Sequence, residues 1–374
     1  MVLESIKYVQ FKGTKNEWNL AHTNLGQINL IVGQNASGKT RTVNIISNLA
    51  KLLSGKIKPT YLSSDYSVIF RKDDKTKILY NLIISNKEVS KEELIVGSKT
   101  LLKRNKTGAG TIFTAQLKKM VNFKSPNTEM MATRRDSLQY PFLVDLHTWS
   151  NNINVYLFGT PLGQNTLLIS DDKVNDQKIN EIESVLKIFK KGKDEHGVKF
   201  TNQVIKDMGI IGYKIKSIDL DKPNNVIANV GLLALYVHEQ GVRESINQMD
   251  ISQGMFRALS LIIQINYFSL LKKSSCIVID DIGEGLDFER STKLINLLIE
   301  KAEKSNVQLI MSTNDRFVMN NVPLKYWSII QREAKGSKIY NYQNSKKIFD
   351  EFEFTGLNNF DFFAKKFFEK GLKK

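Results

Sequence analysis

The chain has 374 residues, and its 41% hydrophobic and 25% charged content excludes wholesale disorder. One cysteine, Cys276, excludes a disulfide scaffold and a cysteine-ligated zinc site, and four scattered histidines argue against a histidine metal cluster. The 54 Lys and Arg residues against 38 Asp and Glu give a net charge of +16, which favours a polyanionic partner such as nucleic acid, although a lysine-rich proteome would produce the same excess.

The N-terminal segment predicts a strand, a second strand and a helix. Leu3–Phe11 is rich in β-formers, and the apolar run at 27–32 predicts a buried strand that ends at Gly33. From Val43 onward apolar residues recur at helical spacing and stop at Gly55. The start of the chain lacks the basic and apolar parts of a secretory signal peptide, and no run approaches 18 apolar residues, so we expect a cytoplasmic protein without membrane contact.

The middle of the chain predicts an insertion of two parts. Several short strands are expected from Tyr66 to Thr114, including a hairpin that turns at 73–75. The stretch 148–212 is polar and then helical, with an amphipathic stripe that we expect to belong to a lid or arm. The stripe consists of Ile179, Ile182, Val185, Leu186 and Phe189.

The C-terminal third alternates helix and strand. Helices are expected at 256–271 and 289–303, and apolar strands at 276–280 and 307–312. Such alternation predicts a parallel sheet covered on both faces, and therefore an α/β fold. The expected division is an α/β core at 1–55 and 214–374, an inserted antiparallel β-lobe at 56–147, and a helical lid or arm at 148–213.

The strongest local motif is the eight-residue run GQNASGKT, which matches the P-loop pattern G-x-x-x-x-G-K-[ST]. An apolar strand precedes it and an amphipathic helix follows, as a phosphate-binding loop requires. We expect Lys39 to reach the β- and γ-phosphates of ATP and Thr40 to ligate Mg²⁺. The other expected nucleotide-binding positions of the loop are Gly33, Gln34, Asn35, Ala36, Ser37 and Gly38.

A second motif lies far downstream, where the apolar run 277–279 ends in Asp280 and Asp281. A strand that delivers a carboxylate at its C-terminal end is what a Walker B motif requires. Asp280 is expected to hold Mg²⁺ through water. Asp281 is expected to lie beside the γ-phosphate and to orient the attacking water.

The segment ISQGMFR at 251–257 resembles the signature of ABC-type ATPases, which precedes the helix leading to the Walker B strand. Ser252, Gln253 and Gly254 fall on that signature. The resemblance extends to a D-loop aspartate at Asp287 and to a switch position, usually His, at Asn314. Four motifs in this order cover roughly 1–50 and 245–335.

The opening strand, the β-lobe and the GxNxSGK[ST] loop are similar to the RecF/SMC-like branch and to the stand-alone ATPases of the OLD group in phage-defence and DNA-repair operons. No heptad run of coiled-coil length is present, and the residues after Walker B show no nuclease-like carboxylate arrangement. The resemblance implies ATP and Mg²⁺ as ligands, and a homodimer in which Ser252 and Gly254 complete the partner's site. It further implies a sensor or motor that acts on nucleic acid and controls a separate effector such as a nuclease. The alternatives are a scaffold that sequesters a toxic effector and a RecF-like DNA-repair ATPase.

This sequence departs from the family pattern at two catalytic positions. Asp281 stands where Glu is usual, and Asn314 stands where His is usual, so we expect slow hydrolysis with Lys39 as the third catalytic residue. Gln139 is the candidate for the glutamine of the Q-loop, with an ordinary loop residue as the alternative.

We draw two further expectations, one from a phenylalanine-rich C-terminal stretch and one from four basic runs. The stretch 360–368 favours a packed docking helix over a base-stacking surface. Four basic runs are candidates for nucleic-acid contact. They are Lys103-Arg104-Lys106, Lys118-Lys119, Lys187 with Lys190-Lys191-Lys193, and Lys365-Lys366.

Overall fold

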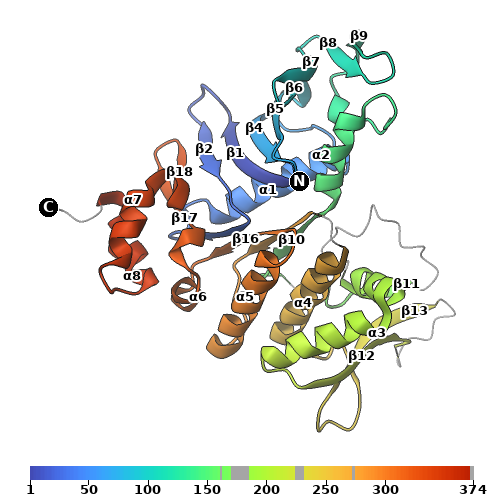
Figure 1. Ribbon diagram of the computed structural model, residues 1–374, viewed down its shortest axis with the longest axis vertical. Helices are drawn as coiled ribbons and strands as arrows, with labels where there is room; N and C mark the ends of the chain where they lie inside the picture. Colours follow the sequence, from blue (N-terminus) through green and yellow to red (C-terminus); the bar gives the residue numbers. More distant parts are fainter. Residues whose placement is uncertain (161, 170–184, 224–230, 272–273, 371–374) are drawn as a thin grey trace.

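A computed structural model describes residues 1–160, 162–169, 185–223, 231–271 and 274–370, and it shows an α/β architecture built on one long mixed sheet (Figure 1). Five neighbouring parallel strands form the centre of this sheet. In spatial order they are β10 (Ile153–Leu157), β15 (Ser275–Asp280), β16 (Val307–Thr313), β3 (Ile28–Val32) and β17 (Trp327–Glu333). The expected fold class is therefore confirmed.

Beyond β17 the same sheet continues through antiparallel pairs, except that β18 (Gly336–Asn341) and β2 (Trp18–Asn24) pair in parallel. After β18 and β2 come β1 (Val2–Gln10), β4 (Ser63–Arg71), β5 (Lys77–Ser85), β6 (Glu88–Val96), β7 (Lys99–Arg104), β8 (Ala109–Thr114) and β9 (Lys119–Lys124). Strands β4 to β9 are a meander of antiparallel pairs, which we call the β-lobe. Because β4 pairs with β1, the β-lobe extends the central sheet without a break.

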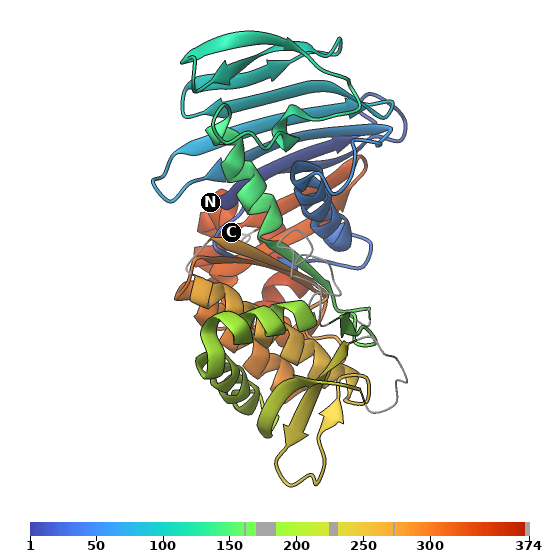
Figure 2. The ribbon, with the colours of Figure 1, turned by 90° about the vertical axis from the view of Figure 1, so that its right-hand side faces the viewer.

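Helices cover both faces of the central strands. One face carries α1 (Lys39–Ser54) and α2 (Pro141–Asn151), and the other carries α3 (Val185–Ile210), α4 (Gln253–Leu271) and α5 (Phe288–Glu303). Figure 2 shows the β-lobe and the α3–α5 layer at opposite ends of the molecule. A small antiparallel sheet lies beside α3 and consists of β11 (Leu168–Ile169), β12 (Ile215–Asp221), β13 (Leu232–Glu239) and β14 (Ile246–Asn247).

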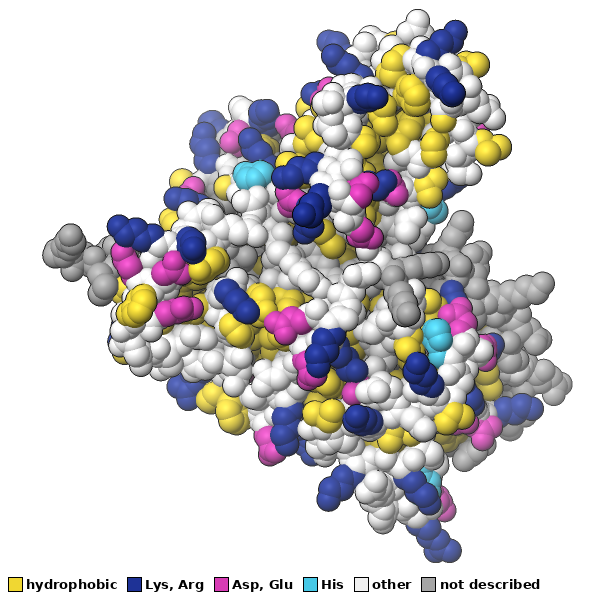
Figure 3. All heavy atoms as spheres, viewed as in Figure 1, with side chains coloured by type: hydrophobic (Ala, Val, Ile, Leu, Met, Phe, Trp, Pro, Cys, Tyr) yellow, Lys and Arg dark blue, Asp and Glu magenta, His cyan; other side chains and the backbone are white. Residues whose placement is uncertain are grey.

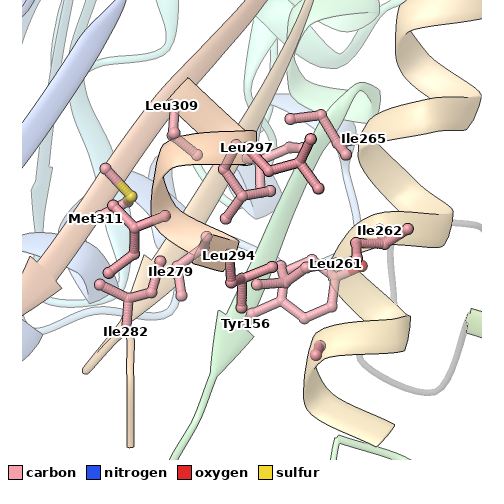
Figure 4. Close-up of a cluster of buried hydrophobic side chains, with 14 of the residues drawn as sticks. Tyr156, Leu261, Ile262, Ile265, Ile279, Ile282, Leu294, Leu297, Leu309 and Met311 are labelled. Carbon is pink, nitrogen blue, oxygen red and sulfur yellow. The ribbon is translucent and has the colours of Figure 1, made fainter. Parts of the chain in front are cut away.

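The central strands are buried on both faces because their alternate side chains enter two different hydrophobic cores. In β15, Ile277 and Ile279 face the core under α4 and α5, whereas Val278 faces the core under α1. Figure 4 shows Ile279, Leu294 and Leu261 converging in the first core. This two-sided burial explains why these strands appear in the sequence as unbroken apolar runs.

The structure also contains central strands that periodicity did not predict. Within 148–213, which we expected to be a helical lid, β10 is instead a strand of the main sheet beside β15. Its five residues are too few for periodicity to separate a strand from a helix. The later part is helical as expected, with α3 kinked at Gly197 (φ 57°), while Ile179 and Ile182 lie outside the described residues.

The C-terminal phenylalanines pack as expected. After α6 (Arg316–Asn321), the helices α7 (Tyr342–Glu353), α8 (Asn359–Ala364) and α9 (Phe367–Lys370) gather at one end of the sheet. Phe362 is fully buried. The centroid of its ring lies 4.7 Å from the ring centroid of Phe349 and 4.9 Å from that of Phe352. This cluster supports the docking interpretation of 360–368.

Helix α4 is long and apolar enough to cross a membrane, and it is the one such helix within the described residues. In its most apolar 18-residue window, 78% of the residues are buried inside the protein. Its apolar character is therefore accounted for by its place in the core beside Tyr156 and Leu294 (Figure 4).

Candidate functional site

The strand order brings three loops to one edge of the sheet. β15, β16 and β3 are parallel neighbours, so the residues that follow each of them meet at the same edge. A pocket of about 440 Å³ lies there. Its walls are formed by Trp18, Asn35, Ala36, Ser37, Gly38, Lys39, Thr40, Arg41, Asp281, Asn314, Arg332 and Ser337.

The loop from Gly33 to Gly38 has the backbone shape of an anion cradle at a helix N-terminus. Gly38 stands before the first residue of α1 with φ 110°, a conformation that side chains rarely adopt, and a Cβ there would lie 2.9 Å from Ser337 Oγ. The Ser337 hydroxyl donates a hydrogen bond to the carbonyl of Ser37 at 2.7 Å and so holds the loop from β18. Within the described residues, the buried Ser37 Oγ has no hydrogen-bond partner, so a bound anion can take that place.

Lys39 lies folded over this loop. Its Nζ donates to the carbonyls of Gly33 at 2.9 Å and Gln34 at 3.2 Å, and 7% of the residue is exposed. Burial lowers the pKa of Lys39, while the charges of Asp281 and Asp280 partly offset that effect. A phosphate that took the place of the two carbonyls would give the ammonium a full countercharge.

The two Walker B carboxylates differ in their surroundings. Asp280 is 6% exposed and accepts a hydrogen bond from the Ser312 hydroxyl. Asp281 follows with φ 54°, a left-handed backbone that costs a non-glycine residue about 1–3 kcal/mol. Burial, with the charges of Asp280 and Glu284, raises the pKa of Asp281, and Lys39 opposes the shift.

Thr40 and Asp280 fit a magnesium ion by the chemistry of their donors. A hydroxyl and a carboxylate are the hard oxygen ligands that Mg²⁺ takes beside phosphate oxygens and water. Thr40 lines the pocket at the start of α1, which follows β3 and the P-loop. Asp280 is the last residue of β15, and β15 lies two strands from β3 in the sheet. The described residues contain no cluster of three or more His, Cys, Asp or Glu, so a metal here depends on phosphate and water for its remaining ligands.

Asn314 reaches the P-loop from the end of β16. Its Nδ2 donates to Asn35 Oδ1 at 3.2 Å, and both residues line the pocket. The structure therefore brings Lys39, Asp281 and Asn314 together, although they are scattered over most of the sequence.

The signature residues lie apart from this pocket. Ser252 precedes α4 and accepts a hydrogen bond from the backbone N–H of Met255 at 3.2 Å, while Gln253 begins the helix. Gly254 packs so closely on the D-loop that a Cβ would lie 2.5 Å from the carbonyl oxygen of Gly285. None of Ser252, Gln253 and Gly254 lines the P-loop pocket.

Asp287 has a structural partner in its own chain. It caps α5 by accepting from the backbone N–H of Arg290 at 2.9 Å, and it pairs with the Arg290 guanidinium at 2.7 Å. These bonds lower its pKa. Asp287 is exposed and, like the signature residues, does not line the pocket.

Gln139 does not lie at the pocket. It belongs to the turn before α2, where its N–H donates to Asp136 and its carbonyl accepts from Ala115. On the side of β15 that faces away from β16, the neighbouring loop is the one after β10. It carries Gln164, which is 8% exposed and donates to the carbonyls of Gln248 and Ile251, both at 2.8 Å.

Sequence reasoning missed four pocket residues and one structural arginine. Trp18 and Arg41 stack with 3.8 Å between the guanidinium carbon and the ring centroid, and Arg332 and Ser337 complete the wall. Only Arg41, two positions after Lys39, could have been suspected from its place in the motif. Arg104, named among the nucleic-acid candidates, is fully buried and donates to the carbonyls of Glu129, Ser125 and Pro126.

No protein-family model and no curated protein matches this sequence. Similar solved structures include an SMC head bound to the C-terminal winged-helix domain of ScpA, at 13% identity and a TM-score of 0.56, with 91% of this chain and 97% of that chain covered. The Smc head domain from Pyrococcus furiosus, with an extended coiled coil and the C-terminal domain of ScpA, is 12% identical with a TM-score of 0.51, and 94% and 99% of the two chains are covered. The fold is therefore that of an SMC head domain.

Proposed function

We propose that this protein binds Mg-ATP in the P-loop pocket, dimerises when ATP is bound and hydrolyses it slowly. The observation that carries the proposal is the convergence of Lys39, Asp281 and Asn314 on one pocket beside a phosphate cradle. Lys39 and the loop N–H groups would hold the phosphates, and Thr40 and Asp280 would hold Mg²⁺. The metal would neutralise the β- and γ-phosphate charge, and Asp281 would orient the attacking water.

The dimer is part of the proposal because the pocket lacks the signature. Ser252 is exposed at the N-terminus of α4, a place suited to an anion, yet it does not line the pocket of its own chain. A second copy that presents Ser252 and Gly254 to this P-loop would complete the site. The first copy would present its own Ser252 and Gly254 to the P-loop of the second in the same way, so that one two-fold interface would bury two nucleotides.

Slow turnover follows from the two catalytic side chains. The Asp281 carboxylate is one methylene shorter than Glu, and Asn314 can donate a hydrogen bond but cannot carry a proton. ATP binding, more than hydrolysis, would then set the state of the molecule.

The test is the molar mass of wild type and of Lys39→Ala by light scattering, each with and without Mg-ATP. We expect wild type to become a dimer only with Mg-ATP and Lys39→Ala to stay monomeric. Lys51→Ala, a change at the far end of the same helix, is the matched control and should behave as wild type. A mass that does not respond to nucleotide in wild type would contradict the switch and would favour a nucleotide-independent scaffold.

We further propose contact with nucleic acid through the outer end of the β-lobe. Exposed lysines gather on β7 to β9 and their turns, and Figure 3 shows Lys and Arg side chains at the outer end of this lobe. They are Lys103, Lys106, Lys118, Lys119 and Lys124. By contrast, the basic run on α3 is engaged in ion pairs, with Lys190 bound to Asp194 and Lys193 to Asp219.

A role as the sensor or motor of phage defence, with a separate nuclease or toxin as effector, rests on the family resemblance. Duplex DNA binding with and without ATP, measured against salt concentration, tests the nucleic-acid contact. Salt-dependent binding supports a DNA-linked sensor or a RecF-like repair ATPase. Absence of binding at low salt, together with co-purification of a neighbouring-gene product, would favour the scaffold that holds an effector inactive.

A further inference from the structure

A single serine hydroxyl joins the two Walker B carboxylate positions. Ser312, fully buried near the end of β16, donates a hydrogen bond to Oδ1 of Asp280 and accepts one from the backbone N–H of Asp281 at 3.0 Å. A hydroxyl has one donor and two acceptor sites, so it satisfies both neighbours at once. We propose that Ser312 is a positioning residue that aims Asp280 at Mg²⁺ and holds Asp281 in place. This inference rests on the proposed function.

The orientation of Asp280 follows from this bond. The side chain is buried at the end of a strand, and Ser312 occupies one carboxylate oxygen. In this proposal the other carboxylate oxygen would serve the metal ion. Without the hydroxyl, the carboxylate would be able to rotate about its χ2 bond, which is a broad torsion, and would lose its fixed aim.

The position of Asp281 depends on the same strand end. Its left-handed backbone, φ 54°, is held between the Ser312 hydroxyl and the bond from the Ile282 N–H to the Ser312 carbonyl at 2.8 Å. The next residue, Thr313, donates from its Oγ1 to the Ile282 carbonyl at 3.3 Å. The turn that carries Asp281 is therefore hydrogen-bonded to β16 at Asp281 and at Ile282, and within the described part of the chain Ser312 supplies the side-chain hydrogen bond to the Asp281 backbone.

β16 also carries Asn314, so one strand end positions Asp280, Asp281 and the switch residue together. Removal of the Ser312 hydroxyl should disturb the metal side of the site and leave the P-loop, which is held by Ser337 from β18, unchanged. The effect should therefore appear in the Mg²⁺-dependent part of nucleotide binding and in turnover.

The experiment compares Ser312→Ala, Ser312→Thr and Ser275→Ala with wild type. Ser275 is buried at the other end of the neighbouring strand β15, and its hydroxyl has no hydrogen-bond partner among the described residues, so Ser275→Ala removes a buried hydroxyl without breaking a bond that the structure shows. A fluorescent ATP analogue is titrated once in EDTA and once at a series of Mg²⁺ concentrations, and phosphate release is measured separately. Thermal unfolding confirms that each variant folds.

We expect Ser312→Ala to bind the analogue in EDTA as wild type does. It should need about tenfold more Mg²⁺ to reach half of the Mg²⁺-dependent increase in analogue binding. Its kcat for phosphate release should fall about tenfold with little change in KM. Ser312→Thr, which keeps the hydroxyl, should restore most of both values, and Ser275→Ala should match wild type. A folded Ser312→Ala with an unchanged Mg²⁺ midpoint and unchanged kcat overturns the role of Ser312. Absence of nucleotide binding by wild type in both conditions overturns the proposed function instead.

Discussion

The side-chain amide of Asn314 donates a hydrogen bond to Oδ1 of Asn35 at 3.2 Å, across 279 positions of sequence. The contact exists because β16 and β3 are parallel neighbours whose C-terminal ends open onto the same pocket. It ties Asn314, the proposed switch residue, to the P-loop. Its chemistry also limits the switch, since an amide forms hydrogen bonds but does not take up a proton near neutral pH.

Restoring the usual switch and catalytic residues should accelerate hydrolysis. In Asp281→Glu/Asn314→His, the longer carboxylate reaches the attacking water and the imidazole can carry a proton, so kcat is expected to rise about tenfold or more. The measurement is steady-state phosphate release at saturating Mg-ATP. Binding of the ATP analogue in EDTA serves as the control and should stay unchanged. A double variant that binds nucleotide normally and turns over no faster would contradict the assignment of these two positions.

The stability of the nucleotide-free protein should depend on the charge of Asp281. Burial and the charge of Asp280 raise the pKa of Asp281 above its ordinary value of 3.8, so the native state holds the proton more tightly than the unfolded chain. The cost of ionisation is therefore absent below pH 3.8 and grows as pH rises through the native pKa.

Asp281→Asn removes that cost and keeps the left-handed backbone, because Asp and Asn both tolerate φ > 0 better than most residues. In EDTA at pH 7 the variant should have a Tm about 1–2 °C above wild type, and the difference should vanish below about pH 3.8. A difference that is constant over the whole pH range would mean that the backbone preference, and not the carboxylate charge, is responsible.

The attachment of α3 to α4 and α5 should depend on the buried carboxylate of Asp207. Asp207 is 1% exposed, pairs with Lys301 at 2.7 Å and accepts from Asn266, and thereby ties α3 to α5 and α4. Asp207→Ala leaves the ammonium of Lys301 without its countercharge and with only the Asn266 side chain as a shown hydrogen-bond partner, so the free energy of unfolding should fall by about 3 kcal/mol in urea titrations. Asp219→Ala breaks an exposed pair with Lys193 and should cost less than about 1 kcal/mol. An equal fall in the free energy of unfolding for the two variants would show that burial does not determine how much these ion pairs stabilise the protein.

Two basic residues of the β-lobe, two positions apart in sequence, should behave in opposite ways. Arg104 is buried and bonded to three carbonyls, so Arg104→Ala should destabilise the protein by about 3 kcal/mol. Lys106 is exposed, and Lys106→Ala should leave stability within about 0.5 kcal/mol of wild type.

The same Lys106→Ala variant tests the nucleic-acid contact. If the lysine faces a phosphate, the slope of log K against log salt concentration should fall by about one unit. The check is DNA affinity at several salt concentrations, with Lys347→Ala, an exposed lysine on α7, as control. If the slope of log K against log salt concentration is the same for Lys106→Ala and wild type, Lys106 does not contact a phosphate.

Local features were predictable from sequence because they are encoded within a few consecutive residues. The turn at Gly38 requires a glycine at φ 110°, and α1 follows it with apolar residues at helical spacing. Asp280 could be placed at a strand end because the apolar run before it is buried on both faces. The phenylalanines of 360–368 were expected to pack, and Phe362 lies in the core.

Contacts between distant segments were decided only by the tertiary structure. The sheet order places β10 beside β15, so the loop with Gln164, and not the turn with Gln139, lies next to the Walker B strand. Likewise, nothing near Trp18 or Arg332 in sequence marks them as walls of the P-loop pocket. Periodicity reports which face of an element is buried, whereas strand order, pairing partners and the closeness of Ser312 to two carboxylates arise from long-range packing.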